Sequence, residues 1–358
     1  MAFNAEALSI IKALNKKLGE GTVIVASQAT EVMPRITTGS LAMDVALGGG
    51  WPANQWSELI GEHSHGKTFV ALNTIAANQR RDPDFVTVWI AAEEWVGDYA
   101  KMLGIDMDRV ILVETNIMED AYDAAIQFAG SQGVDLVVID SLPALVPMQE
   151  DEKSMDEVTV GRAALVTGRF FRKVGKAMKR SMTEETRPVT GLIINQWRSK
   201  IGVMYGDPRT TPGGQAKDYA VFVRVEVKRD GWLERKVEGI SEKQKIGQSI
   251  KVVSLKNKTY PPRQTAFFDM YFAEGGVVDP GQVDAAKEIV ALGILSGVID
   301  RKGAWYHYGG QKWNGADAAL AGIREDLDLS ESLSKEVLDV ITKGKVSLRS
   351  EEEDTDED

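Results

Sequence analysis

The segment "WSELIGEHSHGKT" (Trp56–Thr68) gives a clear indication of the fold class. Its first half, Trp56–Gly61, resembles a buried strand, and "GEHSHGKT" (Gly61–Thr68) fits the phosphate-loop pattern G-x-x-x-x-G-K-[ST]. "KTFVALNTIAANQ" (Lys67–Gln79) follows and reads as a helix. A glycine-rich turn between a strand and a helix points backbone N–H groups at phosphate oxygens, and the helix dipole favours the same anion. The stretch therefore predicts a nucleotide site in an α/β protein.

The loop residues have individual expected roles. All eight are expected to surround the nucleotide phosphates: Gly61, Glu62, His63, Ser64, His65, Gly66, Lys67 and Thr68. Lys67 is expected to reach the β- and γ-phosphates, and the Thr68 hydroxyl to ligate magnesium. Two of the chain's three histidines lie here, which leaves a metal site as an alternative. Glu62, His63 and His65 would need one more ligand, so we favour the nucleotide.

Further strands extend the pattern along the chain. Four short segments are β-branched and nearly continuously apolar, as strands buried on both faces of a parallel sheet are: Val86–Glu93, Val110–Thr115, Val134–Asp140 and Gly191–Gln196. Phe222–Arg229 alternates instead, as at a sheet edge or in an antiparallel addition, and Gly247–Lys258 and Gln264–Phe272 continue in that style. The prediction is an α/β core with a mainly parallel sheet and added antiparallel strands.

Acidic residues at two strand ends are candidates for chemistry. Asp140 ends a buried strand, where a second magnesium ligand is expected. Glu93 and Glu94 end another strand beside the loop, and hydrolysis needs a carboxylate that holds the attacking water. Alternation along the strand predicts that only one of the two faces the phosphate. The alternative is that both are solvated.

The two ends of the chain differ from this core. Asn4–Gly19 predicts a capped helix and Thr22–Ser27 a strand, a unit too small to bury its own apolar stripe. It must dock on its own core or on a neighbouring subunit. Beyond Gly275, helices around "GAWYHYGGQKW" (Gly303–Trp313) predict a small α-rich domain. The predicted division is 1–32, 33–274, 275–346 and an acidic disordered tail, 347–358.

Composition narrows the class of protein. The net charge is −11, but seven of the last eight residues are acidic, so the remainder carries −11 + 7 = −4. A DNA-binding surface would therefore have to be a local basic patch. The chain has no cysteine, which excludes disulfides and thiolate zinc sites and fits a reducing cytoplasm. We expect neither a secretory signal nor a transmembrane helix.

Two segments are candidates for such a patch. The predicted helix Gly161–Arg180 carries cations along one face, which is a phosphate-backbone track or simply a solvated face. The loop Trp197–Lys217 mixes glycines, prolines, cations and apolar residues without periodicity, and loops of this length are usually functional or disordered. Both segments follow the carboxyl ends of predicted strands, where open α/β sheets bind ligands.

Several stretches now resemble the RecA recombinase family over nearly the full chain. They are "ITTGSLAMDVALGGG" (Ile36–Gly50), "IAAE" (Ile90–Glu93), "VDLVVIDSLPALVP" (Val134–Pro147), "INQWRSKIGVMYGDPRTTPGG" (Ile194–Gly214), "KNK" (Lys256–Lys258) and "GAWYHYGGQK" (Gly303–Lys312). The last three are more specific than the phosphate loop, because generic P-loop ATPases lack them. The resemblance implies a RecA-like P-loop ATPase core with ATP and Mg²⁺ as cofactors.

The resemblance also implies roles around the nucleotide. Lys67, Glu93 and Gln196 are the implied catalytic residues; Glu93 rather than Glu94 takes the catalytic glutamate's place, and Gln196 senses the γ-phosphate. Tyr99 stacks on adenine. Lys256 and Lys258 reach ATP bound on the neighbouring subunit.

For DNA, the resemblance implies an ATP-dependent recombinase that forms helical filaments on single-stranded DNA and catalyses homologous pairing and strand exchange. The implied DNA-binding residues are Arg162, Arg169, Arg172, Arg198, Lys200, Ile201, Gly202, Val203, Met204, Arg209, Thr210, Thr211, Gly213 and Gly214. The N-terminal unit would pack on the next protomer, the C-terminal domain would gather double-stranded DNA, and the acidic tail would compete with DNA. Further implied partners are single-strand-binding and mediator proteins, in the cytoplasm and away from membranes.

Departures from the family pattern leave two alternatives open. Ala91 replaces a usual aspartate, and Val160 a usual methionine wedge; the Glu93–Tyr99 spacing is one residue short. Asp218 replaces an interface lysine, for which Lys217 beside it is the candidate substitute. Such divergence is expected of a phage-encoded or distant member. The alternatives are a RecA-fold motor such as a hexameric helicase, and a filament scaffold with little hydrolysis.

Overall fold

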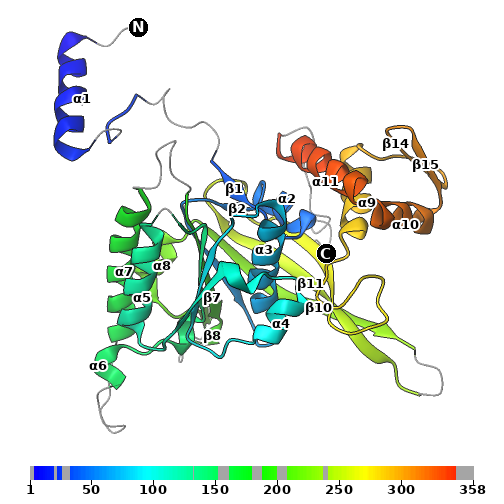
Figure 1. Ribbon diagram of the computed structural model, residues 1–358, viewed down its shortest axis with the longest axis horizontal. Helices are drawn as coiled ribbons and strands as arrows, with labels where there is room; N and C mark the ends of the chain where they lie inside the picture. The colour runs from blue at the N-terminus through cyan, green and yellow to red at the C-terminus, as the bar shows by residue number, and fades with distance from the viewer. Residues whose placement is uncertain are drawn as a thin grey trace, which may run out of the picture.

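A mixed eight-stranded sheet organises the computed structural model, which describes residues 4–19, 22–25, 33–131, 133–151, 161–179, 188–199, 208–236 and 241–343 (Figure 1). Within these residues the strand order is β12-β11-β10-β3-β7-β6-β4-β5. The strands are β3 (Trp56–Gly61), β4 (Thr87–Ala91), β5 (Val110–Glu114), β6 (Leu136–Asp140), β7 (Thr190–Gln196), β10 (Val223–Arg235), β11 (Gln244–Asn257) and β12 (Thr265–Tyr271). From β10 to β5 every pairing is parallel, and β11 and β12 are added antiparallel. The predicted fold class is confirmed.

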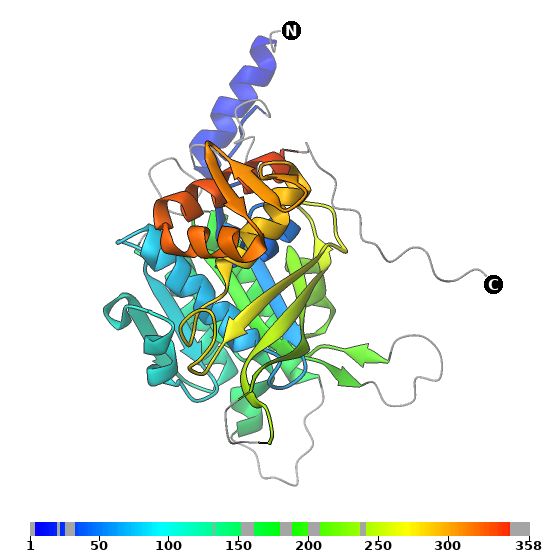
Figure 2. The same ribbon diagram turned by 90° about the vertical axis from the view of Figure 1, so that its right-hand side faces the viewer.

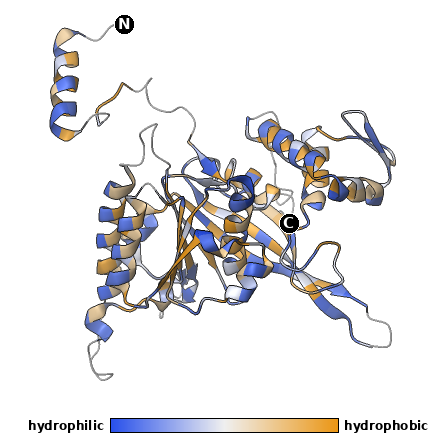
Figure 3. Ribbon diagram, in the orientation of Figure 1, coloured by the Kyte–Doolittle hydropathy of each residue, from blue (hydrophilic) through white to orange (hydrophobic). Residues whose placement is uncertain are grey.

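Helices cover both faces of this sheet, as Figure 1 shows. One face packs against α2 (Leu41–Leu47), α3 (Lys67–Arg81) and α4 (Gly97–Met102), and the other against α5 (Met118–Ala129) and α7 (Arg162–Lys179). On β4, Trp89 joins the first apolar core, whereas Val88 and Ile90 join the second. Because both faces are buried, the inner strands are apolar at successive positions, and they appear so in Figure 3.

Shorter elements complete the core. They are β1 (Arg35–Ile36), β2 (Trp51–Pro52), the 3-10 turns Met107–Arg109 and Leu142–Ala144, α6 (Met148–Asp151), β8 (Arg198–Ser199), β9 (Arg209–Thr210) and α8 (Gly214–Ala220). The small β8–β9 pair closes the base of the loop Trp197–Lys217, called the second predicted DNA loop below because the predicted helix Gly161–Arg180 is the first candidate DNA-binding segment. No helix in the described part of the chain combines the length and apolar character that a membrane crossing needs.

The N-terminal helix α1 (Ala5–Leu18) buries none of its residues. The Asn4 side chain caps it by accepting from the Ala7 N–H at 2.8 Å, as predicted. Its apolar residues Leu8, Leu14 and Leu18 are exposed, and both views show the helix standing apart from the sheet (Figures 1 and 2). The strand predicted next is not formed over residues 22–25, where the Val23 N–H donates to the Asn15 side chain at 2.7 Å. The end of that predicted strand lies outside the described residues.

The C-terminal region has its own apolar core, centred on Ile289, Ile323 and Leu333. Its elements are α9 (Ala285–Ser296), β13 (Asp300–Lys302), β14 (Trp305–Tyr308), β15 (Gln311–Asn314), α10 (Ala316–Glu325) and α11 (Leu327–Thr342). The predicted α-rich character is confirmed by these three helices, whereas the stretch "GAWYHYGGQKW" between them forms β14 and β15, for which no strands were predicted. Gly309 and Gly310 both have positive φ, +48° and +88°, and make the two-residue turn between them.

The contact between Gly191 and Trp56 generates a stability prediction. A Cβ added at Gly191 would overlap the Trp56 ring, which is buried against β7. We expect Gly191→Ala to lower the free energy of unfolding by about 1–3 kcal/mol, since overpacking forces the ring or the strand to move. Urea titration measures this change.

Gly175→Ala is the matched control, because an added Cβ there meets no atom within 4 Å on the exposed side of α7. Helix propensity predicts a gain of about 0.5–1 kcal/mol for this variant. Equal stabilities of the two variants would contradict the packing argument.

Candidate nucleotide and DNA site

The phosphate loop joins the end of β3 to the start of α3, as the sequence predicted. Gly66 precedes α3 with φ +94°, and no side chain caps the helix. The first N–H groups of α3 are therefore left for an anion. A Cβ at Gly61 would overlap the Val227 carbonyl oxygen, and one at Gly66 would lie 2.7 Å from the Ile250 side chain. Gly61 is therefore required sterically, and Gly66 both sterically and by its positive φ.

Lys67 and Thr68 place a cation and a hydroxyl at the start of α3. The Lys67 ammonium donates to the Glu62 carbonyl oxygen at 2.7 Å, so it lies within the curl of the loop. Burial lowers the pKa of Lys67, and the carboxylates of Asp140, Glu93 and Glu62 oppose that shift. The Thr68 hydroxyl donates to the Asp140 carboxylate at 3.3 Å, so the two predicted magnesium ligands are adjacent. Oxygen donors of this kind are what Mg²⁺ prefers.

Asp140 carries an unusual protonation equilibrium. Burial, followed by the nearby charge of Glu93, raises its pKa to about 7, while Thr68 and Lys67 act in the opposite direction. A carboxyl that is half protonated near neutrality indicates a site poised to receive positive charge.

Glu93 lies just beyond the end of β4 and faces this group. The N–H groups of Ala92 and Glu93 both donate to the Asp140 carbonyl oxygen, at 2.9 and 3.1 Å. The Ser141 hydroxyl donates to the Glu93 carboxylate. Glu93 also acts electrostatically on both Lys67 and Asp140. The strand ends at Ala91, before both glutamates, so alternation along the strand does not distinguish Glu93 from Glu94 as expected. The hydrogen bonds of Glu93 distinguish it instead.

His65, one of the two loop histidines, has surroundings that suit an anion. Burial lowers the pKa of His65, and Arg229 and Lys67 lower it further. Within the described residues, no three His, Cys, Asp or Glu side chains are grouped so as to hold a metal ion. The geometry thus gives no support to the alternative of a histidine metal site.

Tyr99 lies on α4 and packs against the core cluster beneath it. Burial raises the pKa of its hydroxyl to about 12, so the ring is neutral at physiological pH. Its stacking on adenine stays a prediction.

Gln196 is brought directly beside the phosphate loop. It ends β7, and the parallel β3–β7 register pairs it with Gly61. The second predicted DNA loop starts at the next residue. The two ends of this loop are described, and Arg198 and Arg209 are exposed there. The residues outside the described part are Lys200, Ile201, Gly202, Val203 and Met204. Gln196 therefore connects the end of the phosphate strand to the base of that loop.

The hairpin at the base of this loop is held to β10. The Trp197 indole and the Arg209 guanidinium both donate to Glu226, at 2.9 and 3.1 Å. The Arg209 guanidinium also lies 4.7 Å from the centre of the Trp197 ring. Arg209 is thus fixed at the rim of the loop, and Thr210, Thr211, Gly213 and Gly214 follow it towards α8.

The basic face predicted on α7 is present. Arg169 and Arg172 are exposed, and Arg162 is half-buried with an unpartnered Nε. Phe170 and Val174 anchor the opposite face in the core. Val160, which stands where the family usually has a methionine wedge, lies outside the described residues. These positions are compatible with DNA binding, which remains a prediction for each residue.

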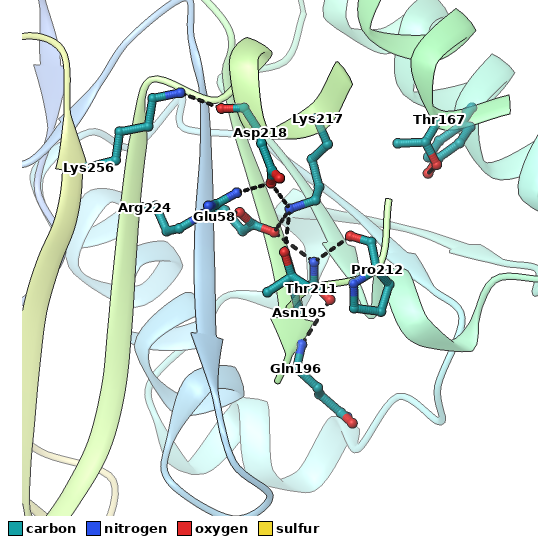
Figure 4. A network of polar contacts seen from close by, with 11 residues as sticks. Glu58, Thr167, Asn195, Gln196, Thr211, Pro212, Lys217, Asp218, Arg224 and Lys256 are labelled. Atoms are coloured by element: carbon teal, nitrogen blue, oxygen red, sulfur yellow. Dashed lines mark hydrogen bonds and ion pairs between the residues drawn. The ribbon is translucent and has the colours of Figure 1, made fainter. Parts of the chain in front are cut away.

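The two predicted interface lysines lie over α8, as Figure 4 shows for Lys256. The Lys256 ammonium donates to the Asp218 carbonyl oxygen, and that of Lys258 to the Tyr219 carbonyl oxygen at 2.8 Å. Burial, together with the charge of Lys258, lowers the pKa of Lys256 to about 8. Lys217 does not substitute for the missing interface lysine, because its side chain is completely buried. It lies on α8, which directs this side chain into the protein.

Glu58 is the buried ion-pair partner of Lys217, and it was not identified from the sequence as a functional residue. It lies on β3, and Arg224 on β10 and Asn195 on β7 contact it from either side. The available signal was an acidic residue inside an otherwise apolar, doubly buried strand, since such a charge requires partners.

Fold and site together define a P-loop ATPase whose nucleotide loop is linked to a second, basic loop. The model for the RecA N-terminal domain matches residues 6–277. Curated proteins named "Protein RecA" are similar over most of the chain: 34% identity over 98% of this chain and 94% of the relative in a Nostoc species, 36% over 92% and 90% in a Nocardioides species, and 34% over 93% and 82% in Lactococcus lactis. The chain belongs to the RecA family. It is an ATP-dependent DNA recombinase with DNA-dependent ATPase activity, and it binds DNA and associates with itself.

Asp140 generates a prediction about pH and stability. With its pKa raised to about 7 from 3.8, the folded protein holds a proton that the unfolded chain releases. Its contribution is most favourable below pH 4 and is lost as pH rises through 7. Asp140→Asn, measured without nucleotide or magnesium, should therefore gain stability relative to the parent protein between pH 5 and pH 8, by at most about 3 kcal/mol, because about two pKa units lie between pH 5 and the folded pKa.

Glu94→Gln is the control, since this exposed carboxyl makes none of the Asp140 contacts. Denaturant titrations at several pH values compare the variants with the parent protein. A constant difference between Asp140→Asn and the parent from pH 5 to pH 8 would contradict the prediction.

Proposed function

We propose that this recombinase binds ATP and Mg²⁺ at the phosphate loop, hydrolyses ATP with Glu93, and uses Gln196 to link the nucleotide to the second DNA loop. The proposal rests on one observation. The side chains of Lys67, Thr68, Asp140 and Glu93 converge where β3, β4 and β6 end, and Gln196 lies beside Gly61 in the neighbouring strand.

Each side chain then has a physical task. The loop N–H groups and Lys67 hold the β- and γ-phosphates. Thr68 and Asp140 hold the magnesium ion, which supplies positive charge to the phosphate oxygens when bound. Glu93 orients the attacking water and accepts its proton, while the Ser141 hydroxyl keeps the carboxylate in place. Tyr99 stacks on the adenine, and the neighbouring subunit contributes Lys256 and Lys258.

Gln196 and the predicted DNA-binding residues would couple the state of the nucleotide to DNA binding. A side-chain amide can hydrogen-bond a γ-phosphate oxygen and lose that bond after hydrolysis. The movement would reach the loop Trp197–Gly214, whose cations neutralise phosphates and whose apolar residues wedge between bases without reading sequence. The exposed arginines of α7 would extend the same track.

The remaining parts of the chain would serve assembly and DNA capture. We propose four segments: 1–32 docks on the next protomer, 33–274 is the ATPase core, 275–346 gathers double-stranded DNA, and the tail 347–358 competes for DNA-binding cations. Exposed Arg301, Lys302 and Lys312 give the third segment a basic rim. Mediator and single-strand-binding proteins are further proposed partners, in the cytoplasm where the DNA lies.

Glu93→Gln tests the catalytic assignment. An amide cannot accept the proton of the attacking water, so hydrolysis should fall by about 100-fold or more, while ATP binding and filaments on single-stranded DNA persist. Glu94→Gln is the matched control and should hydrolyse ATP normally. Phosphate release, DNA binding and strand exchange are measured on the same preparations. The reverse pattern in the two variants would move the catalytic role to Glu94, and a parent protein lacking strand exchange would favour a motor or a scaffold.

Gln196→Ala tests the link between the two loops. The variant should still bind ATP, but a non-hydrolysable ATP analogue should no longer tighten its binding to single-stranded DNA. Titration of labelled single strands with and without the analogue, at fixed salt, gives the ratio of the two affinities. Gln127→Ala, an exposed glutamine on α5, is the control. An unchanged ratio in Gln196→Ala would exclude Gln196 as the link.

A further inference from the structure

A buried lysine lies at the centre of the polar network in Figure 4. The side chains of Lys217 and Glu58 are both 0% exposed, and the Lys217 ammonium lies 2.5 Å from the Glu58 carboxylate. The ammonium also donates to the Thr211 hydroxyl and to the Asp218 carboxylate, each at 2.9 Å. All three donors of the lysine are therefore used, which a buried cation requires.

Glu58 joins three parts of the nucleotide and DNA machinery. One carboxylate oxygen accepts from Lys217 and from the Asn195 amide at 2.6 Å, and the other accepts from Arg224 at 2.7 Å. Asn195 also donates to the Pro212 carbonyl oxygen at 3.1 Å and accepts the Gln196 N–H at 2.9 Å. The strand that leads into the phosphate loop thus holds both the outgoing and the returning end of the second DNA loop.

The same network continues to the lysines that face the neighbouring subunit. The Asp218 carboxylate accepts from Lys217 and Arg224. Burial is the largest single influence on the pKa of Asp218 and acts to raise it, but Lys217 and Arg224 together lower that pKa below its usual value. The Asp218 backbone oxygen accepts from Lys256. Because Asp218 lies on α8, which starts where the loop ends, displacing α8 displaces the carbonyl oxygens that hold Lys256 and Lys258.

We propose that Lys217 is a positioning residue that transmits DNA binding from the second loop, through α8, to the lysine pair at the subunit interface. This inference rests on the proposed function and deepens it. The lysine ties the returning end of the loop, at Thr211, to Glu58 and to Asp218. A strand of DNA that moves the loop must therefore move α8 as one unit, and Lys256 and Lys258 change position with it. Asp218 thereby makes its contacts within one subunit, although the family usually has an interface lysine at this position.

Lys217→Met tests the proposal, because methionine fills similar space without the ammonium. We measure kcat and KM for ATP with and without single-stranded DNA. The expected result is a drop of at least tenfold in the ratio of DNA-stimulated to DNA-free kcat, with the DNA-free KM within twofold of the parent protein. Asp218→Asn, which keeps the side-chain oxygen but weakens the tie, should lower the ratio by about threefold. A purely structural role would change folding and leave this ratio intact.

The double variant Glu58→Gln/Lys217→Met guards against loss of folding, since it removes both charges of the buried pair together. If Lys217→Met does not fold, the ratio is taken from the double variant, where the same tenfold drop is expected. Lys335→Met, an exposed lysine on α11, is the matched control. A folded Lys217→Met or double variant with a DNA stimulation within threefold of the parent overturns the proposal. Absence of DNA stimulation in the parent protein would instead overturn the proposed function.

Discussion

The parallel register between β3 and β7 is the constraint on which the rest of the site depends. It sets Gly61 beside Gln196, so the strand that carries the phosphate loop and the strand that carries the second loop end together. A shift by one residue would exchange the faces of β7 and send its buried side chains to the wrong layer. Glu58, three residues before Gly61, is then level with Ile193 and within reach of Asn195, Lys217 and Arg224. The β3–β7 register thus determines both the position of Gln196 beside the phosphate loop and the attachment of the second loop to Glu58.

Local patterns in the sequence predicted the elements that depend on local chemistry. The phosphate loop, the buried strands and the acids at their ends are set by neighbours along the chain, and the structure brings Lys67, Thr68, Asp140 and Glu93 together as expected. The helical pattern does not predict the C-terminal sheet, because its short, aromatic strands lie between long helical stretches; the two glycines at their turn are the local hairpin signal.

The Lys217 network shows why other contacts could not be predicted. Lys217 and Arg224 meet Glu58 across separations of 159 and 166 residues, and neither residue has a local signal for its partner. Lys217 was expected at an interface because it is charged and sits beside a departure from the family pattern. Its burial follows from the direction in which α8 turns after Gly213, whose positive φ of +102° precedes the helix. Such a direction is a property of the folded chain and not of the residue type.

The proposed docking of α1, whose apolar stripe is unburied within its own subunit, would give assembly of this protein a direction. A helix that leaves its subunit to pack on another makes a heterologous contact, in which the donor surface and the acceptor surface differ. Every assembled row then ends in one subunit with a free helix and one with a free acceptor surface, so its two ends are chemically distinct and can add subunits at different rates. Because DNA strands also have a direction, docking through the exposed leucines of this one short helix would let the polymer distinguish the two orientations of the strand that it covers.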